Sequence, residues 1–210
     1  MVSSLGVDTL VLTNAAKVEK GYFGSHLLRE PDTLRAKVVE GLSQCGITTL
    51  PRVEVTRRLK VFLQDDLERL FPAHAWVRAV AHPQRLGEPP PGGGGGGAAD
   101  GVDGAGCCEM APRITDLGLP PGCDPGDARI LVAVGPEGGW DEDSELGLLR
   151  AHGFQAVTLG PRVLRSDVAV CSLLALAHDW VATHKGTAAA TAGGAPAPAP
   201  APAPTSALGG

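Results

Sequence analysis

Two glycine-rich loops that lie close together in the sequence carry residue types suited to binding a small molecule. The first is Gly135-Pro-Glu-Gly-Gly139, which follows a short apolar run, and the second is Leu159-Gly-Pro-Arg-Val-Leu-Arg165. Glycine has no side chain, so a ligand can approach the main chain closely and bind its N–H and C=O groups. If each loop follows a strand of a parallel sheet, both loops meet at the carboxyl edge of that sheet, where α/β proteins bind their ligands.

The chemistry of the first loop favours a neutral or cationic ligand. The loop lacks the Lys-Ser/Thr pair of a phosphate-binding loop and the G-x-G-x-x-G spacing of a dinucleotide fold. Glu137 would repel an incoming phosphate. An adenine ring and a sulfonium group both fit a loop that offers main-chain groups and a carboxylate. The alternative interpretation is a tight glycine-rich turn without a ligand.

The second loop combines apolar and basic residues. Gly160 permits close approach, and Val163 and Leu164 can form the wall of an adenine pocket. Arg162 and Arg165 can contact RNA phosphates or orient a base. Surface salt bridges are the alternative role for both arginines.

Two further residues are candidates because of where they fall in the sequence. Asp167 opens the last predicted helix, where it can cap the helix or accept a hydrogen bond or a proton from a substrate N–H group. His82 ends a predicted strand, which makes it a candidate for the same ligand pocket. A purely structural role is the alternative for this histidine.

Strands alternate with helices along the chain, which predicts an α/β fold with a parallel sheet and helices on both of its faces. Apolar and β-branched runs predict the strands, and helical spacing of apolar residues with suitable capping residues predicts the helices. The predicted strands are 9–13, 52–55, 75–81, 130–134 and 155–159. The predicted helices are 31–45, 61–70, 141–152 and a last one that begins at Ser166 or Asp167 and ends at about residue 181.

The last predicted helix is apolar almost all round. A helix with two apolar faces needs a second surface to cover it. It either inserts between the sheet and its neighbours or forms a dimer interface, and the sequence pattern alone does not separate these two arrangements.

Composition and charge limit the classes of function. The net charge of −5 argues against coating of nucleic acid by the whole chain. A local basic patch is still compatible with this charge, although solvated surface is the alternative for its residues. One candidate patch consists of Arg52, Arg57, Arg58 and Lys60.

Cysteine usage and apolar runs indicate the compartment. The five cysteines form no Cys-x-x-Cys pair, which predicts reduced thiols in an intracellular protein and no metal site. No apolar run approaches the length of a membrane span, and residue 1 is not followed by a signal peptide. We therefore expect a cytoplasmic protein with no membrane partner, or an organellar one if a transit peptide precedes residue 1.

Together the two loops resemble a known family. The stretches Val132–Trp140 and Phe154–Arg165, followed by an Ala/Leu-rich helix, are similar to the RsmE family, the 16S ribosomal RNA uracil-N3 methyltransferases of the SPOUT class. Residues 5–12 and 51–55 also follow the order of this family. The resemblance covers roughly residues 3–85 and 128–183.

The resemblance implies a SPOUT-type trefoil knot at the C-terminal end of a parallel sheet, S-adenosylmethionine bound in the knot, and a homodimer through the knotted helices. It implies no metal, and small-subunit ribosomal RNA as the substrate. By this similarity the cofactor-binding residues are His82, Gly135, Pro136, Glu137, Gly138, Gly139, Leu159, Gly160, Val163, Leu164 and Arg165.

The same resemblance sets the expected domain boundaries. We expect an N-terminally truncated SPOUT methyltransferase domain in residues 1–85 and 128–184. A low-complexity insert in 86–127 and a disordered Ala/Pro/Gly tail in 185–210 complete the chain, because such sequences bury too little apolar surface to fold.

The chain departs from the family pattern at three places. The N-terminal PUA-like RNA-binding domain of the family has no counterpart, and the insert interrupts the region between the third strand and the next motif. Ser166-Asp167-Val168 stands where the family usually has threonine–glutamate–threonine, so the carboxylate is one methylene shorter.

The sequence therefore predicts an enzyme that transfers a methyl group from S-adenosylmethionine to N3 of a uridine. Arg165 would orient the uracil or a phosphate, and Asp167 or Glu137 would assist removal of the N3 proton. One alternative is a catalytically impaired S-adenosylmethionine-binding dimer or ribosome-assembly factor without its RNA-recognition domain. Another is a general glycine-rich nucleotide-binding domain.

Overall fold

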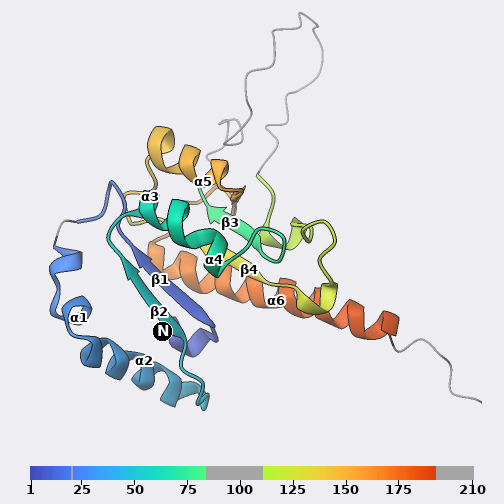
Figure 1. The fold of residues 1–210 in the computed structure, drawn as a ribbon, viewed down its shortest axis with the longest axis horizontal. Helices are drawn as coiled ribbons and strands as arrows, with labels where there is room; N and C mark the ends of the chain where they lie inside the picture. The colour runs from blue at the N-terminus through green and yellow to red at the C-terminus, as the bar shows by residue number, and fades with distance from the viewer. Residues whose placement is uncertain (20, 84–110, 193–210) are drawn as a thin grey trace, which may run out of the picture.

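Five strands form two parallel sheets in the computed structural model, which describes residues 1–19, 21–83 and 111–192. Strand β1 (Thr9–Thr13) pairs with β2 (Arg52–Thr56), and β3 (Val77–Ala81) lies between β4 (Ile130–Ala133) and β5 (Gln155–Val157). All three pairings are parallel, with Ala79 opposite both Val132 and Gln155. The predicted α/β class and the parallel pairing are confirmed (Figure 1).

The division into two sheets differs from the single predicted sheet. A groove lined by residues of β1, β4 and the last helix separates β1 from β4. Among the described residues, no ladder joins the edges of β1 and β4. Strand β3 begins two residues after its predicted start, and β4 and β5 end one and two residues before their predicted ends. The carboxyl ends of β4 and β5 lead into the two glycine-rich loops.

The segment between β1 and β2 is helical. A short helix, α1 (His26–Arg29), precedes α2 (Pro31–Cys45), whose bounds match the prediction. Pro31 occupies the first turn, where its missing N–H costs no hydrogen bond, and Gly46 ends the helix with a φ of +69°. Figure 1 shows α2 at the far end of the molecule from β5.

One face of β3 is covered by two helical segments. The first runs without a break through α3 (Leu59–Val61), a π-helical turn (Phe62–Asp66) and α4 (Leu67–Leu70). The second consists of a π-helical turn (Glu142–Leu146) and α5 (Gly147–Ala151). Their apolar side chains pack with Val80 of β3 in one buried cluster that includes Leu63, Leu67, Trp140, Leu146 and Leu149.

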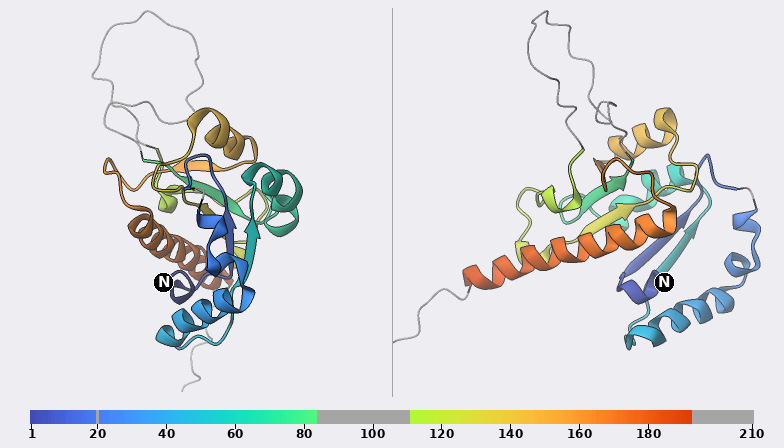
Figure 2. Two further views of the ribbon diagram at one scale, coloured as in Figure 1. Left: turned by 90° about the vertical axis from the view of Figure 1, so that its left-hand side faces the viewer. Right: turned by 180° about the vertical axis from the view of Figure 1, so that it is seen from behind.

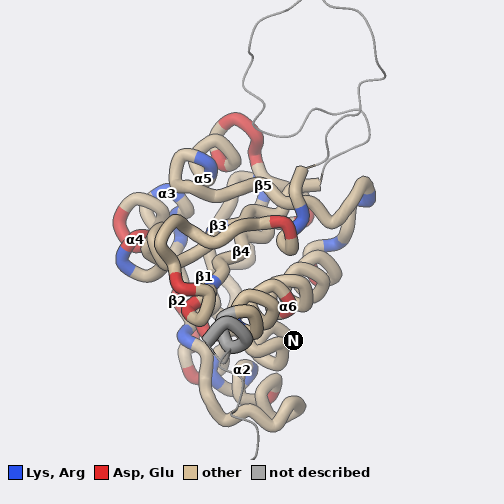
Figure 3. Tube along the Cα trace, turned by 90° about the vertical axis from the view of Figure 1, so that its right-hand side faces the viewer, with Lys and Arg blue, Asp and Glu red and all other residues tan. Residues whose placement is uncertain are grey.

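The last helix, α6 (Ser166–Ala192), covers the other face of β3. Val77 and Ala79 of the strand pack with Leu173, Ala177 and Trp180 of α6. Figure 2 shows α6 running across the sheet along most of the molecule, and Figure 3 shows that few charged residues lie on it. Helices therefore cover both faces of β3, as predicted, and side chains alternate between the two clusters with the two-residue period of a strand.

Two expected boundaries differ from the structure. Residues 111–127, expected to belong to the insert, contain 3-10 turns at Ile114–Asp116 and Pro125–Asp127, and Ile114 is buried against α6. The indole Nε1 of Trp180 donates a hydrogen bond to the carbonyl oxygen of Leu117 at 2.8 Å. The packed region therefore resumes at residue 111 rather than 128, because apolar residues in this segment supply contacts that its Gly- and Pro-rich surroundings obscure. The rest of the expected insert, from residue 86 to 110, lies outside the described residues.

Helix α6 ends at Ala192, well beyond the predicted end near residue 181. Residues 185–192, assigned by sequence to a disordered tail, are helical because alanine has the highest helix propensity and this stretch is rich in it. The remainder of the expected tail, 193–210, lies outside the described residues. Despite its length, α6 is too weakly apolar to cross a membrane, and the same holds for every other helix in the described part of the chain.

Candidate functional site

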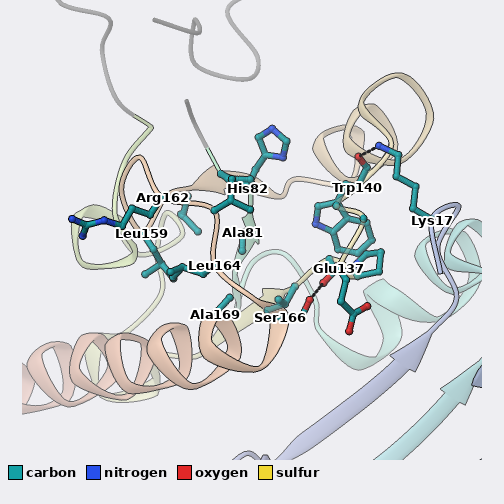
Figure 4. A pocket seen from close by; sticks show the side chains of 18 of the residues that line it. Lys17, Ala81, His82, Glu137, Trp140, Leu159, Arg162, Leu164, Ser166 and Ala169 are labelled. Atoms are coloured by element: carbon teal, nitrogen blue, oxygen red, sulfur yellow. Dashed lines mark hydrogen bonds between the residues drawn. The ribbon is translucent and has the colours of Figure 1, made fainter. Parts of the chain in front are cut away.

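A pocket of about 390 Å³ opens at the carboxyl edge of the β4-β3-β5 sheet. Its volume lies within the range typical of small-molecule sites. Residues from both glycine-rich loops line it, together with Ala81 and His82 at the end of β3 (Figure 4). The parallel register explains this position, because it brings the carboxyl ends of all three strands to one edge.

The first loop, Gly135–Gly139, is fixed by its own turn and by the buried Trp140 that follows it. The N–H of Gly139 donates to the carbonyl oxygen of Pro136 at 2.8 Å, and Gly139 has a φ of +72° that favours glycine. Trp140 is only 5% exposed, and its ring lies so close to Gly135 that a Cβ there would meet the indole at 3.1 Å. The buried Nε1 of Trp140 has no hydrogen-bond partner among the described residues.

The second loop, Leu159–Arg165, is more open. Gly160 has a φ of +104°, and its N–H donates to Oγ1 of Thr158 at 3.1 Å. Val163 is 66% exposed and Leu164 is also exposed, although both are apolar. Figure 4 shows Leu159 and Leu164 together on one side of the pocket, with Trp140 and Lys17 on the other.

A hydrogen bond joins the first loop to Ser166, the residue that directly follows the second loop. The hydroxyl of Ser166, the first residue of α6, donates to the carbonyl oxygen of Gly135 at 3.2 Å. These residues lie 31 positions apart in the sequence. The bond fixes the start of α6 against the end of β4, and so holds the two loops on either side of one pocket.

The structure brings most of the predicted cofactor-binding residues together. Those that line the pocket are His82, Gly135, Pro136, Glu137, Gly138, Gly139, Leu159, Gly160, Val163 and Leu164. Arg165 and Asp167 do not line it. They form an ion pair with each other at 3.2 Å beside the start of α6, where the Arg165 side chain is 83% exposed. Arg165 is therefore placed to meet a partner from solvent rather than a ligand inside the pocket.

Sequence reasoning missed several lining residues. Lys17, Trp140 and Glu142 are among them and carry polar side-chain groups, as does Ser166. Arg162, predicted only as an RNA contact, also lines the rim, with its side chain extending away from the centre (Figure 4). The others are Ala81, Pro83, Val134, Val157 and Ala169. Trp140 was identifiable because it follows the first loop directly, whereas nothing in the sequence places Lys17 near residue 140.

Carboxylates gather around the first loop. Glu137 and Glu142 line the pocket, and Asp141 caps the helical segment that follows. The hydroxyl and the N–H of Ser144 both donate to the Asp141 carboxylate and hold its pKa below the usual range. Asp141 thus serves the start of the helix, whereas Glu137 and Glu142 make this side of the pocket suited to a cationic group. Within the described residues no cluster of three or more His, Cys, Asp or Glu side chains has the geometry of a metal site.

Comparison with known proteins relates the region around the pocket to RNA methyltransferases. Residues 113–178 match the model of an RNA methyltransferase domain. The chain is 28% identical over 183 residues to ribosomal RNA small subunit methyltransferase E of Treponema pallidum, a match that covers 85% of this chain. A segment of 48 residues is 52% identical to the protein of the same name from Synechocystis. In these regions the chain is similar to RsmE proteins and to the RNA methyltransferase domain.

The RsmE relatives are longer than this chain. The chain spans 56% of the length of the Treponema protein. Among solved structures, the RsmE of Neisseria gonorrhoeae bound to S-adenosylmethionine matches with a TM-score of 0.57 and 20% identity, covering 83% of this chain and 56% of that one. A Legionella pneumophila protein with bound S-adenosylmethionine matches with a TM-score of 0.54 and 20% identity, covering 84% of this chain and 57% of that one. These structures share the fold of the RsmE-like region described above.

Proposed function

We propose that this chain is an S-adenosylmethionine-dependent methyltransferase that acts on N3 of a uridine in small-subunit ribosomal RNA. The observation that carries the proposal is the pocket formed by two glycine-rich loops and held by the Ser166–Gly135 hydrogen bond, in a chain that is similar to RsmE proteins. Two RsmE-like folds of known structure bind S-adenosylmethionine.

The residues present fit S-adenosylmethionine. Leu159, Val163 and Leu164 provide an apolar side for an adenine ring, and main-chain groups of Gly135–Gly139 are available for hydrogen bonds. The unpartnered Nε1–H of Trp140 lies beside the pocket, which leaves a donor for a polar group. Glu137 and Glu142 offset the positive charge of a sulfonium. The cofactor, when bound, supplies an activated methyl group.

The chain's own residues have to position the base and take up its proton. Uracil N3 carries a hydrogen and is a weak nucleophile until that proton leaves, so a nearby carboxylate assists the reaction. Glu137 lines the pocket, whereas Asp167 is paired with Arg165 outside it. We assign the proton to Glu137 and keep Asp167 as the residue that orients Arg165. Arg165 would in turn contact the uracil or an adjacent phosphate, and holding the reacting atoms together supplies most of the acceleration.

The proposal includes a homodimer built on α6 and a trefoil knot formed by the two loops. Val168 of α6 is exposed beside Val163 and Leu164, so the start of this helix presents apolar side chains that a second copy would cover. Light scattering coupled to size-exclusion chromatography would measure the oligomeric state, and a monomer at micromolar concentration would contradict this part of the proposal. Acting on ribosomal RNA also implies residence in the compartment where small subunits are assembled.

Methyl transfer to isolated small ribosomal subunits tests the function. The subunits should come from a strain that lacks its own enzyme, and mass spectrometry of the RNA should reveal a single N3-methyluridine. S-adenosylmethionine binding without product would instead favour the catalytically impaired dimer or assembly factor. If calorimetric titration detected no binding of S-adenosylmethionine, the cofactor assignment would be wrong.

A further inference from the structure

The segment that follows β1 is joined to the first glycine-rich loop, although the two are far apart in the sequence. Ala16 donates its main-chain N–H to Oε1 of Glu145 at 2.7 Å, and Nζ of Lys17 donates to the carbonyl oxygen of Trp140 at 3.1 Å. A Cβ at Gly138 would lie 2.9 Å from the Cβ of Lys17, so these two segments of the chain are in close contact. Figure 4 shows Lys17 reaching Trp140 at the edge of the pocket.

Glu145 is the centre of this junction. Its second oxygen, Oε2, accepts the N–H of Asp141 at 2.9 Å, and the residue is 8% exposed. Hydrogen bonds to an ionised acceptor are stronger than those between neutral groups. One buried carboxylate therefore ties together the segment after β1, which includes Lys17, and the start of the helix that follows the first loop.

Helix capping explains only half of this arrangement. Asp141, the N-cap, accepts the N–H of Ser144, and Glu145 reaches back to the N–H of Asp141 from one position beyond the N3 residue of a capping box. A capping box uses one oxygen of the glutamate. The other oxygen bonds Ala16, which is 129 residues away and belongs to neither the helix nor its cap.

We infer that Glu145 is a positioning residue for the pocket: its carboxylate locks residues 16 and 17 onto the first loop, and ligand binding and this locking stabilise each other. The inference rests on the proposed function, because it takes the pocket as the S-adenosylmethionine site. Docking of Lys17 and occupation of the pocket both favour one conformation of Gly135–Trp140. Two events that favour one conformation strengthen each other by the same factor.

The substitution Glu145→Gln tests the inference with little change of shape. One acceptor oxygen remains, but the new amide group turns a donor toward one of the two N–H groups. We expect the Kd for S-adenosylmethionine to rise about tenfold, which corresponds to about 1.4 kcal/mol. The KM for S-adenosylmethionine should rise similarly. At saturating S-adenosylmethionine, kcat should stay within about twofold, because the bound cofactor restores the conformation of the first loop, including Glu137.

Amide hydrogen exchange gives a readout that is independent of activity. The N–H of Ala16 should be protected in the native chain and exchange faster in the Glu145→Gln variant. S-adenosylmethionine should slow exchange at Ala16 further in the native chain. Unchanged exchange at Ala16 together with unchanged affinity in the variant would overturn the inference.

A matched variant separates locking from capping. Asp141→Ala removes the bond to Ser144 and leaves the Glu145–Ala16 bond in place, so the Kd should stay within about twofold. Equal losses of affinity in the two variants would assign the effect to the helix cap and overturn the inference. If Glu145→Gln does not fold, Lys17→Ala can be tested instead, because it removes the hydrogen bond from Lys17 to Trp140. The Kd for S-adenosylmethionine should then rise about threefold, and an unchanged Kd would overturn the inference.

Failure of the proposed function has a different signature. A native chain that binds no S-adenosylmethionine refutes the cofactor assignment. Hydrogen exchange at Ala16 in the ligand-free native chain and in the ligand-free Glu145→Gln variant would still show whether the Glu145 carboxylate holds residues 16 and 17. Failure of this contact can therefore be distinguished from failure of the cofactor assignment.

Discussion

The two loops of the pocket leave the same sheet edge but are held very differently. The first is fixed by buried Trp140, by the turn at Gly139 and by the Glu145 carboxylate behind it. The second ends in exposed Val163 and Leu164 and in exposed Arg165, which pairs with its near neighbour Asp167. The first loop is thus held by contacts within the chain, whereas the second keeps exposed side chains that a partner can contact.

This contrast indicates a division of roles. A preorganised loop binds a small ligand without a further ordering cost, whereas an exposed loop meets that cost only when a larger partner arrives. We therefore expect changes in the first loop to act strongly on the cofactor, changes at Leu164 to act on it less, and changes at Arg165 to act mainly on the nucleic acid.

Gly135→Val should have the largest effect. A Cβ at Gly135 would meet the buried Trp140 indole at 3.1 Å, and the extra methyl groups of valine have no room. We expect the Kd for S-adenosylmethionine to rise by at least about 100-fold, or binding to vanish, as overpacking displaces the loop. Calorimetric titration measures this. Gly147→Ala is the control, because a Cβ at Gly147 meets nothing within 4 Å, and it should bind like the native chain.

Arg165→Ala should separate the two roles most clearly. The side chain is exposed and does not line the pocket, so the Kd for S-adenosylmethionine should stay within about twofold. Methyl transfer to ribosomal RNA should fall by about tenfold or more, because a charged contact to the substrate is lost. Arg35→Ala on α2, also exposed, should change neither quantity. A rise in Kd equal to the loss of activity would show that Arg165 serves the cofactor and not the RNA.

Leu164→Ala should have an intermediate effect on the cofactor. The side chain lines the pocket but is partly exposed before binding, so a ligand buries only part of its apolar surface. We expect the Kd to rise about fivefold, from the transfer free energy of the methyl groups removed. Val163→Ala provides the comparison and should weaken binding less, since Val163 is more exposed. The reverse order would mean that the loop closes over the ligand with Val163 inside.

Ser144→Ala should have the smallest effect and one that depends on pH. The Ser144 hydroxyl and then its N–H hold the pKa of Asp141 below its usual value, so loss of the hydroxyl should raise that pKa toward the usual value. A carboxyl group with a lowered folded pKa stabilises the fold above its unfolded pKa, and this contribution is lost as pH falls through the folded pKa. The native chain should therefore unfold at a higher temperature than the variant at pH 7, and the gap should close as the pH falls through the lowered pKa of Asp141. A gap independent of pH would point to lost packing rather than charge.

Local signals made much of the fold predictable. The bounds of β1 and α2 match because a β-branched run and a Pro–Gly pair mark them without help from distant residues. The two loops met at one pocket as expected because parallel strands fix where their ends lie. The π-helical turns within the predicted helices 61–70 and 141–152 were not predictable, since apolar spacing does not distinguish hydrogen-bonding patterns that differ by one residue.

Contacts that depend on tertiary structure were beyond the sequence. The approach of Lys17 to Gly138 and the bond from Ala16 to Glu145 join distant segments, and no local pattern predicts them. Ile114 and Leu117 pack against α6, but their neighbourhood of glycine and proline suggested an insert. The separation of the sheets is likewise set by the groove between β1 and β4, which involves residues from three elements.

The placement of the three tryptophans gives the protein an intrinsic optical reporter. Trp140 lines the pocket, whereas Trp180 is bonded to Leu117 and Trp76 lies against Arg129. Replacing Trp76 and Trp180 by phenylalanine would leave Trp140 as the sole indole fluorophore. Its emission would then follow occupancy of the pocket in real time, without a label on the ligand or on the RNA.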